Sequence, residues 1–383
     1  MDQTVAIQDR YGAAAQALEP ALCCPVTYDA KYLRVIPQDV LDRDYGCGDP
    51  SRFVKPGDTV LDLGSGGGKI CFIASQVVGS TGRVIGVDRN HAMLSLARWA
   101  RPQVAEAIGY DNIEFRCGQI QDLALDLEAV DDWLATRPVR TREDLFALTA
   151  EQQRLRRTQP LIADASIDVV VSNCVLNLVG EDERRTLFAE LFRVVKIGGR
   201  VAISDIVCDE DVPLHQRQDA TLWSGCISGA FREDRFLQAF ADAGFHGICL
   251  AKRDEKPWRV VEGIEYRAVT VVAYKGKQGE CREGHHAILY PGPWSEVRDD
   301  DGHVFRRGER TAVCAKTYHL VTSDPYAHHV IGLPPYQAIP ESQQQPFACD
   351  AERVRHPHET KNGVLPADWK PSNGACSPGS SCC

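Results

Sequence analysis

The sequence predicts a doubly wound α/β domain with a mostly parallel sheet, followed by a smaller C-terminal α+β domain. Residues 53 to about 275 alternate short β-branched segments with longer helix-like segments. Strands joined by helical crossovers form parallel sheets that helices cover on both faces. Residues 276–383 lose this alternation and end in a segment rich in proline, glycine and serine. The polar, turn-forming segment KGKQGE marks the boundary near 275–280.

Five buried strands are expected, each a short β-branched run. They are TVLDLG (59–64), GRVIGVD (82–88), IEFRCG (113–118), IDVVVSN (167–173) and GRVAISDI (199–206). The helical candidates between them include ICFIASQVV (70–78), HAMLSLARWARPQVAEAI (91–108) and DERRTLFAELFRVVK (182–196). Residues 1–52 precede the first strand and are expected to form an N-terminal cap that carries substrate cysteines.

Two segments lie outside this simple alternation. Residues 127–163 are polar and rich in Arg, Asp and Glu, which indicates a helical insertion with a solvated face. The tail from Ala351 onward contains the ending PSNGACSPGSSCC and is expected to be mobile.

Composition limits the classes of partner. The chain has 43 basic and 53 acidic side chains in 383 residues, and its net charge of −10 argues against nucleic acid binding. The apolar share of 44% is that of an ordinary globular protein. No apolar stretch is long enough to span a bilayer, and MDQTVAIQDRYG does not resemble a secretory signal. We therefore expect a cytoplasmic monomer with reduced thiols and no membrane partner.

A glycine-rich loop follows the first expected strand. The segment VLDLGSGGGK places glycines at 64, 66, 67 and 68 before a helix, and such glycines let the backbone approach a ligand closely. Asp88 ends the next strand, 24 residues after Gly64, where a carboxylate can accept both hydroxyls of a ribose. The pattern predicts a cofactor that contains a nucleoside, although a tight turn alone also explains the glycines.

The residues around the loop favour S-adenosylmethionine over a nucleotide. A dinucleotide usually takes G-x-G-x-x-G spacing, whereas this loop reads G-S-G-G-G and follows Asp62, a carboxylate poorly suited to phosphate. S-adenosylmethionine carries an ammonium and a sulfonium but no phosphate. Ile120 and Gln121 follow the third strand and are expected to flank the adenine, unless they simply end that strand. The candidate cofactor-binding residues are Asp62, Gly64, Ser65, Gly66, Asp88, Arg89, Met93, Ile120, Gln121 and Asn173.

The chain has fifteen cysteines, and two groups of them stand out by context. Cys71, Cys117 and Cys314 lie in apolar or strand contexts and are expected in the core. The second group lies at turns or strand ends, beside Pro, Gly, Asn or Trp, and is expected at the mouths of sites. It comprises Cys23 or Cys24, Cys47, Cys174 and Cys226.

Cys174 follows a strand at the carboxyl edge of the sheet, onto which the glycine loop also opens. A thiol beside a methyl donor can be a nucleophile, a methyl acceptor or a ligand for a soft, thiophilic centre. The spacing is compatible with all three.

These motifs resemble the arsenite S-adenosylmethionine methyltransferases, over nearly the full length. The combination of SNCVLNL, W-x-x-C and YGCG is specific to that group, whereas the glycine loop is common to many methyltransferases. The matching segments are YGCG, DLGSGGGK, GVD, SNCVLNLV, FRVVKIGG, ISD, LWSGCISGA, HHAILYPG, FRRGERTAV, SDPYAHHVIG and the terminal double cysteine. The chain departs from the family in the 127–163 insertion, in Lys69, and in Ser224 and Gly225 before Cys226.

The resemblance implies a class I, Rossmann-like methyltransferase that detoxifies arsenite or its thiol conjugates. Cys174 and Cys226 match the pair that holds trivalent arsenic, and Cys47 matches the third thiol. The family's amino-terminal cysteine corresponds to Cys23 or Cys24, and in the family it can form a disulfide with the third thiol. Thioredoxin or glutathione then serves as the reductant.

The implied chemistry needs positioning rather than a general base. Three thiols replace the As–O bonds of neutral arsenous acid, and the arsenic lone pair attacks the methyl carbon. Methylation of another thiophilic centre, such as antimonite, or of a small organic acceptor is the alternative enzyme function. A metalloid sensor or buffer is the non-catalytic alternative. The C-terminal Cys376, Cys382 and Cys383 could deliver arsenic or have no role.

Overall fold

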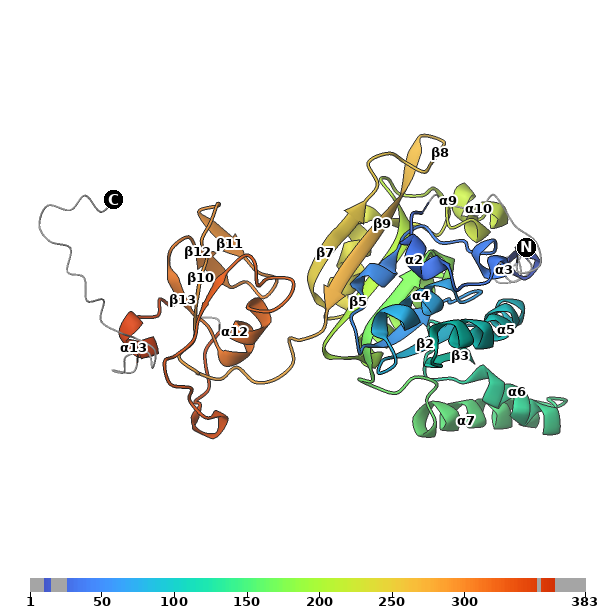
Figure 1. Ribbon diagram of the computed structural model, residues 1–383, viewed down its shortest axis with the longest axis horizontal. Coiled ribbons are helices and arrows are strands. Elements are labelled where there is room, and N and C mark those ends of the chain that lie inside the picture. Colours follow the sequence, from blue (N-terminus) through green and yellow to red (C-terminus); the bar gives the residue numbers. More distant parts are fainter. Residues whose placement is uncertain (1–9, 15–25, 350–352, 362–383) are drawn as a thin grey trace, which may run out of the picture. The chain divides into compact units, whose positions relative to one another are not determined.

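The computed structural model describes residues 10–14, 26–349 and 353–361 (Figure 1). The chain divides into two compact units, Met1–Gly276 and Lys277–Cys383. Cys23, Cys24, Cys376, Cys382 and Cys383 lie outside the described residues. Within the described residues, no helix has the length and apolar character needed to cross a membrane.

The first unit is built on one mixed sheet with the strand order β3-β2-β1-β4-β5-β9-β7. The five strands from β3 to β5 are parallel, while β9 runs antiparallel to both β5 and β7. Short β6 and β8 pair with β5 and β9. The strands are β1 (Thr59–Leu63), β2 (Arg83–Asp88), β3 (Ile113–Cys117), β4 (Ile167–Asn173), β5 (Val195–Cys208), β6 (Phe231–Arg232), β7 (His246–Arg253), β8 (Arg259–Val261) and β9 (Ile264–Tyr274). The predicted mostly parallel, doubly wound sheet is confirmed.

Helices cover both faces of this sheet because alternate strand residues point to opposite faces. Val169 and Val171 of β4 belong to the core that contains α4 and α5. Val170, between them, belongs to the opposite core, with α8 and α11. The helices of the unit are α2 (Ala30–Leu33), α3 (Gln38–Leu41), α4 (Lys69–Val78), α5 (His91–Ile108), α6 (Leu127–Thr136), α7 (Arg142–Thr158), α8 (Glu181–Val194), α9 (Leu214–Arg217), α10 (Ala220–Ser224) and α11 (Glu233–Asp242), with 3-10 turns η2 (Pro50–Phe53) and η3 (Leu176–Leu178).

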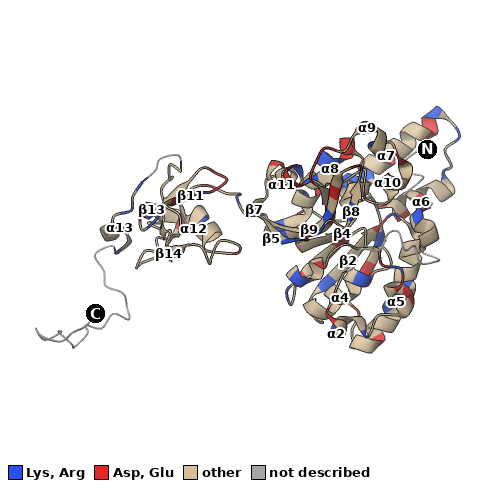
Figure 2. Cartoon of the chain, turned by 90° about the horizontal axis from the view of Figure 1, so that it is seen from above, with Lys and Arg blue, Asp and Glu red and all other residues tan. Residues whose placement is uncertain are grey.

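The polar stretch between β3 and β4 forms two helices, α6 and α7. Asp126 caps α6, and Thr141 with Asp144 forms a capping box at the start of α7. Val130 and Leu155 pack the two helices into a small cluster, while most other residues of α7 are exposed or half-buried. Acidic and basic residues are interspersed along the first unit (Figure 2).

The second unit has two small sheets. Three antiparallel strands take the order β13-β10-β14, and β11 pairs with β12. Ile288, Phe305 and Val313 are fully or almost fully buried in its core. Its elements are β10 (Ala287–Leu289), β11 (Glu296–Arg298), β12 (Val304–Arg306), β13 (Arg310–Ala312), α12 (Ala315–Val321), β14 (Ile331–Leu333), η4 (Glu341–Gln343) and α13 (Pro357–Lys361).

The prediction of a mobile tail from Ala351 is wrong for residues 353–361. Val354 pairs with Thr311, and α13 follows. Arg355 is fully buried and forms ion pairs with Glu283 and Glu359. Paired in this way, a buried guanidinium ties the segment to the unit.

Candidate active site

A cavity of about 420 Å³ lies where the parallel strands of the first unit end. This is the edge at which open α/β sheets bind ligands. All ten candidate cofactor-binding residues line this one cavity: Asp62, Gly64, Ser65, Gly66, Asp88, Arg89, Met93, Ile120, Gln121 and Asn173. Cys174 lines it as well.

The glycine loop takes a conformation that other residues rarely adopt. Gly64, Gly66 and Gly68 have φ values of +66°, +51° and +90°. A Cβ on Gly64 would lie 2.4 Å from a methyl carbon of Val175, so the space is also closed to a side chain. The Gly66 amide donates a hydrogen bond to Asp88 Oδ2 at 2.8 Å, which fixes the loop against the end of β2.

Asp62 is a buried carboxylate in a negative environment. It lies in β1 with an exposure of 2%, and the Cys71 thiol donates a hydrogen bond to it at 3.2 Å. Burial raises the pKa of Asp62 to about 7, and the charges of Asp88 and Asp44 act in the same direction. Burial likewise raises the pKa of Asp88. A bound cation would offset this cost, so the site favours a positively charged ligand.

Lys69 holds the segment before β1 in place through contacts that the sequence did not predict. Its ammonium forms an ion pair with Asp44 and lies 3.7 Å from the ring centroid of Tyr28. Both partners come from the segment before β1. Lys69 thus ties that segment to the start of α4. Its ion pair holds Asp44 in the cavity wall.

Two buried polar atoms in the cavity wall have no hydrogen-bond partner among the residues that the structure describes. They are Oγ of Ser65 and Nε1 of Trp223. Buried polar groups are normally satisfied, and orphaned ones commonly mark a ligand or water position. Together with the carboxylates Asp62 and Asp88, this donor and acceptor set fits a cationic nucleoside such as S-adenosylmethionine.

The cysteines expected at the mouths of sites are buried, although Cys174 lines the cavity. Cys47, Cys174 and Cys226 are only 2%, 6% and 5% exposed, and they share one apolar cluster. The cover comes partly from the N-terminal residues, because Tyr11 Oη lies 3.9 Å from the Cys226 sulfur. Arg10 also donates hydrogen bonds to the α10 segment. No periodic pattern in the sequence indicated this long-range packing.

Cys47 and Cys174 are joined by a disulfide, with their Cα atoms 5.8 Å apart. The resemblance implies a bond between Cys47 and the amino-terminal cysteine, so the partner of Cys47 differs here. The Cys226 thiol donates a hydrogen bond to the backbone carbonyl of Cys174 at 3.3 Å. The structure therefore brings these three residues together.

Asn173 holds the Cys47 loop against the end of β4. Its Oδ1 accepts from the amides of Cys47 (2.8 Å) and Gly48 (3.0 Å). Its Nδ2 donates to the Gly48 carbonyl (2.8 Å) and to the Tyr28 hydroxyl (3.2 Å). These four bonds use the full capacity of the amide. Asn173 lines the cavity, but its amide is committed to the loop rather than to a ligand.

The glycines of YGCG allow this close approach. A Cβ on Gly46 would lie 2.1 Å from Asn173 Nδ2, and one on Gly48 would lie 2.4 Å from Ser204 Oγ. Neither position tolerates a side chain without movement of the loop.

Cys174 and Cys226 both have a strained backbone. Their φ values are +61° and +60°, which is uncommon for residues other than glycine. Such strain persists only where surrounding contacts enforce it, and it concentrates at functional sites. Both cysteines belong to the predicted substrate set.

Asp205 is a site residue that the sequence analysis missed, because its strand reads as a plain buried run. It is fully buried, and it accepts hydrogen bonds from the amides of Leu176 and Asn177 just after Cys174. Burial raises its pKa to about 7. One of its oxygens lies within 4.8 Å of the sulfurs of Cys47 and Cys174.

Comparisons with known proteins agree with this geometry. The family described as Methyltransferase domain matches residues 54–146 and 139–244, and a domain of unknown function matches residues 277–364. An arsenic(III) S-adenosylmethionine methyltransferase from Chlamydomonas reinhardtii has the same fold, with a TM-score of 0.55. It is 22% identical, and the match covers 89% of this chain and 100% of that one.

Three curated relatives carry the name arsenite methyltransferase. That of Halobacterium salinarum is 36% identical over 60% of this chain, and the match spans about half (48%) of the relative's own length. That of Aquipseudomonas alcaligenes is 28% identical over 84% of this chain and 88% of its own. That of Mus musculus is 26% identical over 91% of this chain and 87% of its own length. The chain belongs to the arsenite methyltransferase family.

Proposed function

We propose that this chain transfers methyl groups from S-adenosylmethionine to trivalent arsenic held by cysteine thiolates. The observation that carries the proposal is the position of Cys174. It lines the cavity that contains Asp62 and Asp88, and it contacts both Cys47 and Cys226. A methyl donor and a thiophilic acceptor can therefore meet at one edge of the sheet.

Different cavity residues bind different parts of the cofactor. Asp62, in its ionised form, holds the ammonium, and Asp88 accepts hydrogen bonds from the ribose hydroxyls. Ile120 and Gln121 flank the adenine. When bound, S-adenosylmethionine supplies an electrophilic methyl group on its sulfonium. Arg89 and Met93 complete the wall beside Asp88.

The thiols select the substrate by bond exchange rather than by charge. Arsenous acid is neutral at pH 7, and each thiol that replaces an As–O bond releases one water. Thiolates from Cys47, Cys174 and Cys226 that converge on one atom gain a high effective concentration. The arsenic lone pair is retained and attacks the methyl carbon. Asn173 acts as a positioning residue, because it holds the Cys47 loop in place.

Reduction completes the cycle. Methyl transfer leaves arsenic formally pentavalent. Two of the arsenic-bound thiolates then return two electrons to arsenic, since their As–S bonds break as the S–S bond forms, and no proton is released because both thiols lost their protons when they displaced water. The Cys47–Cys174 disulfide is the oxidised product of such a step. Thioredoxin or glutathione reduces this bond, and three thiols then become available to the next arsenite.

The test is arsenite-dependent consumption of S-adenosylmethionine by purified protein with a thiol reductant. Cys174→Ser and Cys226→Ser are expected to lose activity by at least about 100-fold, since each removes a ligand from the same atom. Cys249→Ser is the matched control, because Cys249 is exposed on β7. Undiminished turnover in both active-site variants would refute the proposal and favour an organic acceptor.

A further inference from the structure

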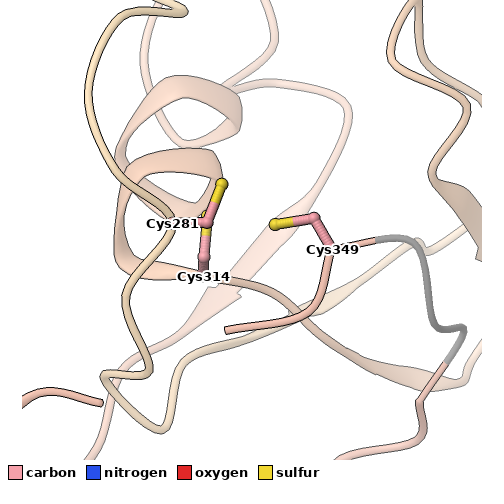
Figure 3. Close-up of side chains that lie close together, drawn as sticks. All are labelled: Cys281, Cys314 and Cys349. Atoms are coloured by element: carbon pink, nitrogen blue, oxygen red, sulfur yellow. The ribbon is translucent and has the colours of Figure 1, made fainter. Parts of the chain in front are cut away.

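A second group of thiols lies in the C-terminal unit, where the sequence indicated only a core cysteine at Cys314. The C-terminal thiol cluster consists of Cys281, Cys314 and Cys349, whose sulfurs all lie within 4.8 Å of one another. None of the three is in a disulfide. Figure 3 shows the sulfur of Cys349 directed toward the other two.

Backbone hydrogen bonds hold the three segments together. The Phe347 amide donates to the Cys281 carbonyl at 2.9 Å, and Arg282 forms a bridge with Pro346. The Ala315 amide donates to the Arg282 carbonyl at 2.9 Å, which ties in the segment of Cys314. The thiols therefore converge on a preformed frame, and a ligand would need little rearrangement to reach all three.

The three thiols differ in burial. Cys314 is fully buried, and its sulfur accepts a hydrogen bond from the Thr317 amide at 3.3 Å. Cys281 and Cys349 are half-buried, which leaves a route from solvent.

The number of thiol ligands indicates which ion or metalloid the cluster binds. Zn²⁺ in structural sites takes four ligands, almost always in a tetrahedron. Within the described residues, no His, Asp, Glu or further Cys side chain joins the three sulfurs as a fourth ligand. Trivalent arsenic takes three ligands and keeps a lone pair at the fourth corner. Soft thiolates also favour a soft centre.

We propose that the C-terminal thiol cluster is a second binding site for trivalent inorganic arsenic. Three thiols and one arsenous acid give one As(S-Cys)₃ centre and three waters, with no change in oxidation state. The cluster belongs to the unit after Gly276, within the segment that matches a domain of unknown function. Its chemistry does not depend on methyl transfer.

Ligand number also sets the selectivity of this site. Arsenous acid can exchange three As–O bonds, whereas monomethylarsonous acid can exchange two and a dimethylated acid only one. The affinity is expected to fall with each methyl group, by about tenfold or more, because each lost sulfur removes one intramolecular contact. The site therefore retains unmethylated arsenic and releases methylated products.

The test uses the full chain with the other arsenic-binding candidates removed. The background variant carries Ser at the positions of Cys47, Cys174 and Cys226, and at Cys23, Cys24, Cys376, Cys382 and Cys383. Equilibrium dialysis of the reduced protein against arsenite, followed by elemental analysis, is expected to give one arsenic per chain. Adding Cys349→Ser or Cys281→Ser should weaken binding by roughly 100-fold, whereas adding Cys249→Ser should not.

Thermal unfolding in the absence of arsenite shows whether each variant is folded. Cys281 and Cys349 are replaced rather than Cys314 because they are only half-buried, so that their substitution disturbs the core less. In the background variant arsenite is expected to raise the melting temperature, and in the Cys349→Ser addition it is not. Absence of stoichiometric arsenic in the folded background variant would overturn the proposal. Equal binding in the Cys349→Ser addition, or bound Zn²⁺ that arsenite does not displace, would overturn it too.

Discussion

Replacing Asp62 by Asn should stabilise the ligand-free protein and abolish cofactor binding. Asp62 is 2% exposed, and its pKa of about 7 lies about 3 above the ordinary value of 3.8. The unfolded chain releases this proton near pH 4, whereas the folded chain holds it until about pH 7. Stability therefore falls as the pH rises between these values, and the full cost of about 4 kcal/mol applies above pH 7.

Asp62→Asn removes this cost at pH 8, because the amide stays neutral. The Cys71 thiol can still donate to the amide oxygen, but the new NH₂ group has no partner, which costs about 1–3 kcal/mol. The net gain in the free energy of unfolding is therefore about 1–3 kcal/mol. Affinity for S-adenosylhomocysteine, which carries the same ammonium, should fall at least about 100-fold, a loss of roughly 3 kcal/mol.

Urea unfolding and calorimetric titration at pH 8 measure the two effects on the same protein. Asp111→Asn is the matched control, because Asp111 is a half-exposed carboxylate that pairs with Arg101 on the surface. It should change neither quantity by more than about 0.5 kcal/mol. If Asp62→Asn binds S-adenosylhomocysteine as tightly as the parent protein, the assignment of Asp62 to the ammonium is wrong.

Three further predictions follow from the site. Affinity of the parent protein for S-adenosylhomocysteine should fall about fivefold between pH 7 and pH 6, because the ionised share of Asp62 falls from about a half to about a tenth. A flat calorimetric profile would contradict this. Asn173→Ala should lower the free energy of unfolding by about 2–4 kcal/mol and raise KM for arsenite more than it lowers kcat, since four hydrogen bonds to the loop and its neighbour are lost. An unchanged KM would exclude the positioning role. Gly48→Ala should lower the free energy of unfolding by about 1–3 kcal/mol, because the new Cβ would overlap Ser204. It should also slow formation of the Cys47–Cys174 disulfide, which peptide mapping can follow. Disulfide formation at the parent rate would show that the loop is not displaced.

Local patterns in the sequence predicted the parts of the molecule that depend on neighbouring residues. The alternation of β-branched runs and helices predicted the sheet. The glycines at 64, 66 and 68 and the spacing to Asp88 predicted one wall of the cavity. These features follow from strand period and backbone freedom, which a few adjacent residues determine.

Contacts between distant segments were not predictable in the same way. Asp44 and Lys69 are 25 residues apart, and nothing in either segment indicates their ion pair. The sequence predicted cysteines at the mouths of sites because Pro, Gly and Asn flank them. The fold buries Cys47, Cys174 and Cys226, and Tyr11 lies against the sulfur of Cys226.

Cys314 illustrates the same limit in the second unit. Its apolar context predicted a core cysteine, and its side chain is indeed fully buried. Its sulfur nevertheless lies beside those of Cys281 and Cys349, which come from segments 33 and 35 residues away. Apolar context predicts burial, but only the fold shows which side chains share the buried space.

Arsenic K-edge X-ray absorption of the reduced protein tests the central claim most directly. The sample is the Cys281→Ser, Cys349→Ser double variant with one equivalent of arsenite, so that the C-terminal thiol cluster cannot contribute. Three sulfur neighbours around arsenic are predicted, and Cys226→Ser in the same background should reduce them to two. Oxygen neighbours alone, or a coordination shell that Cys174→Ser and Cys226→Ser both leave unchanged, would contradict the account.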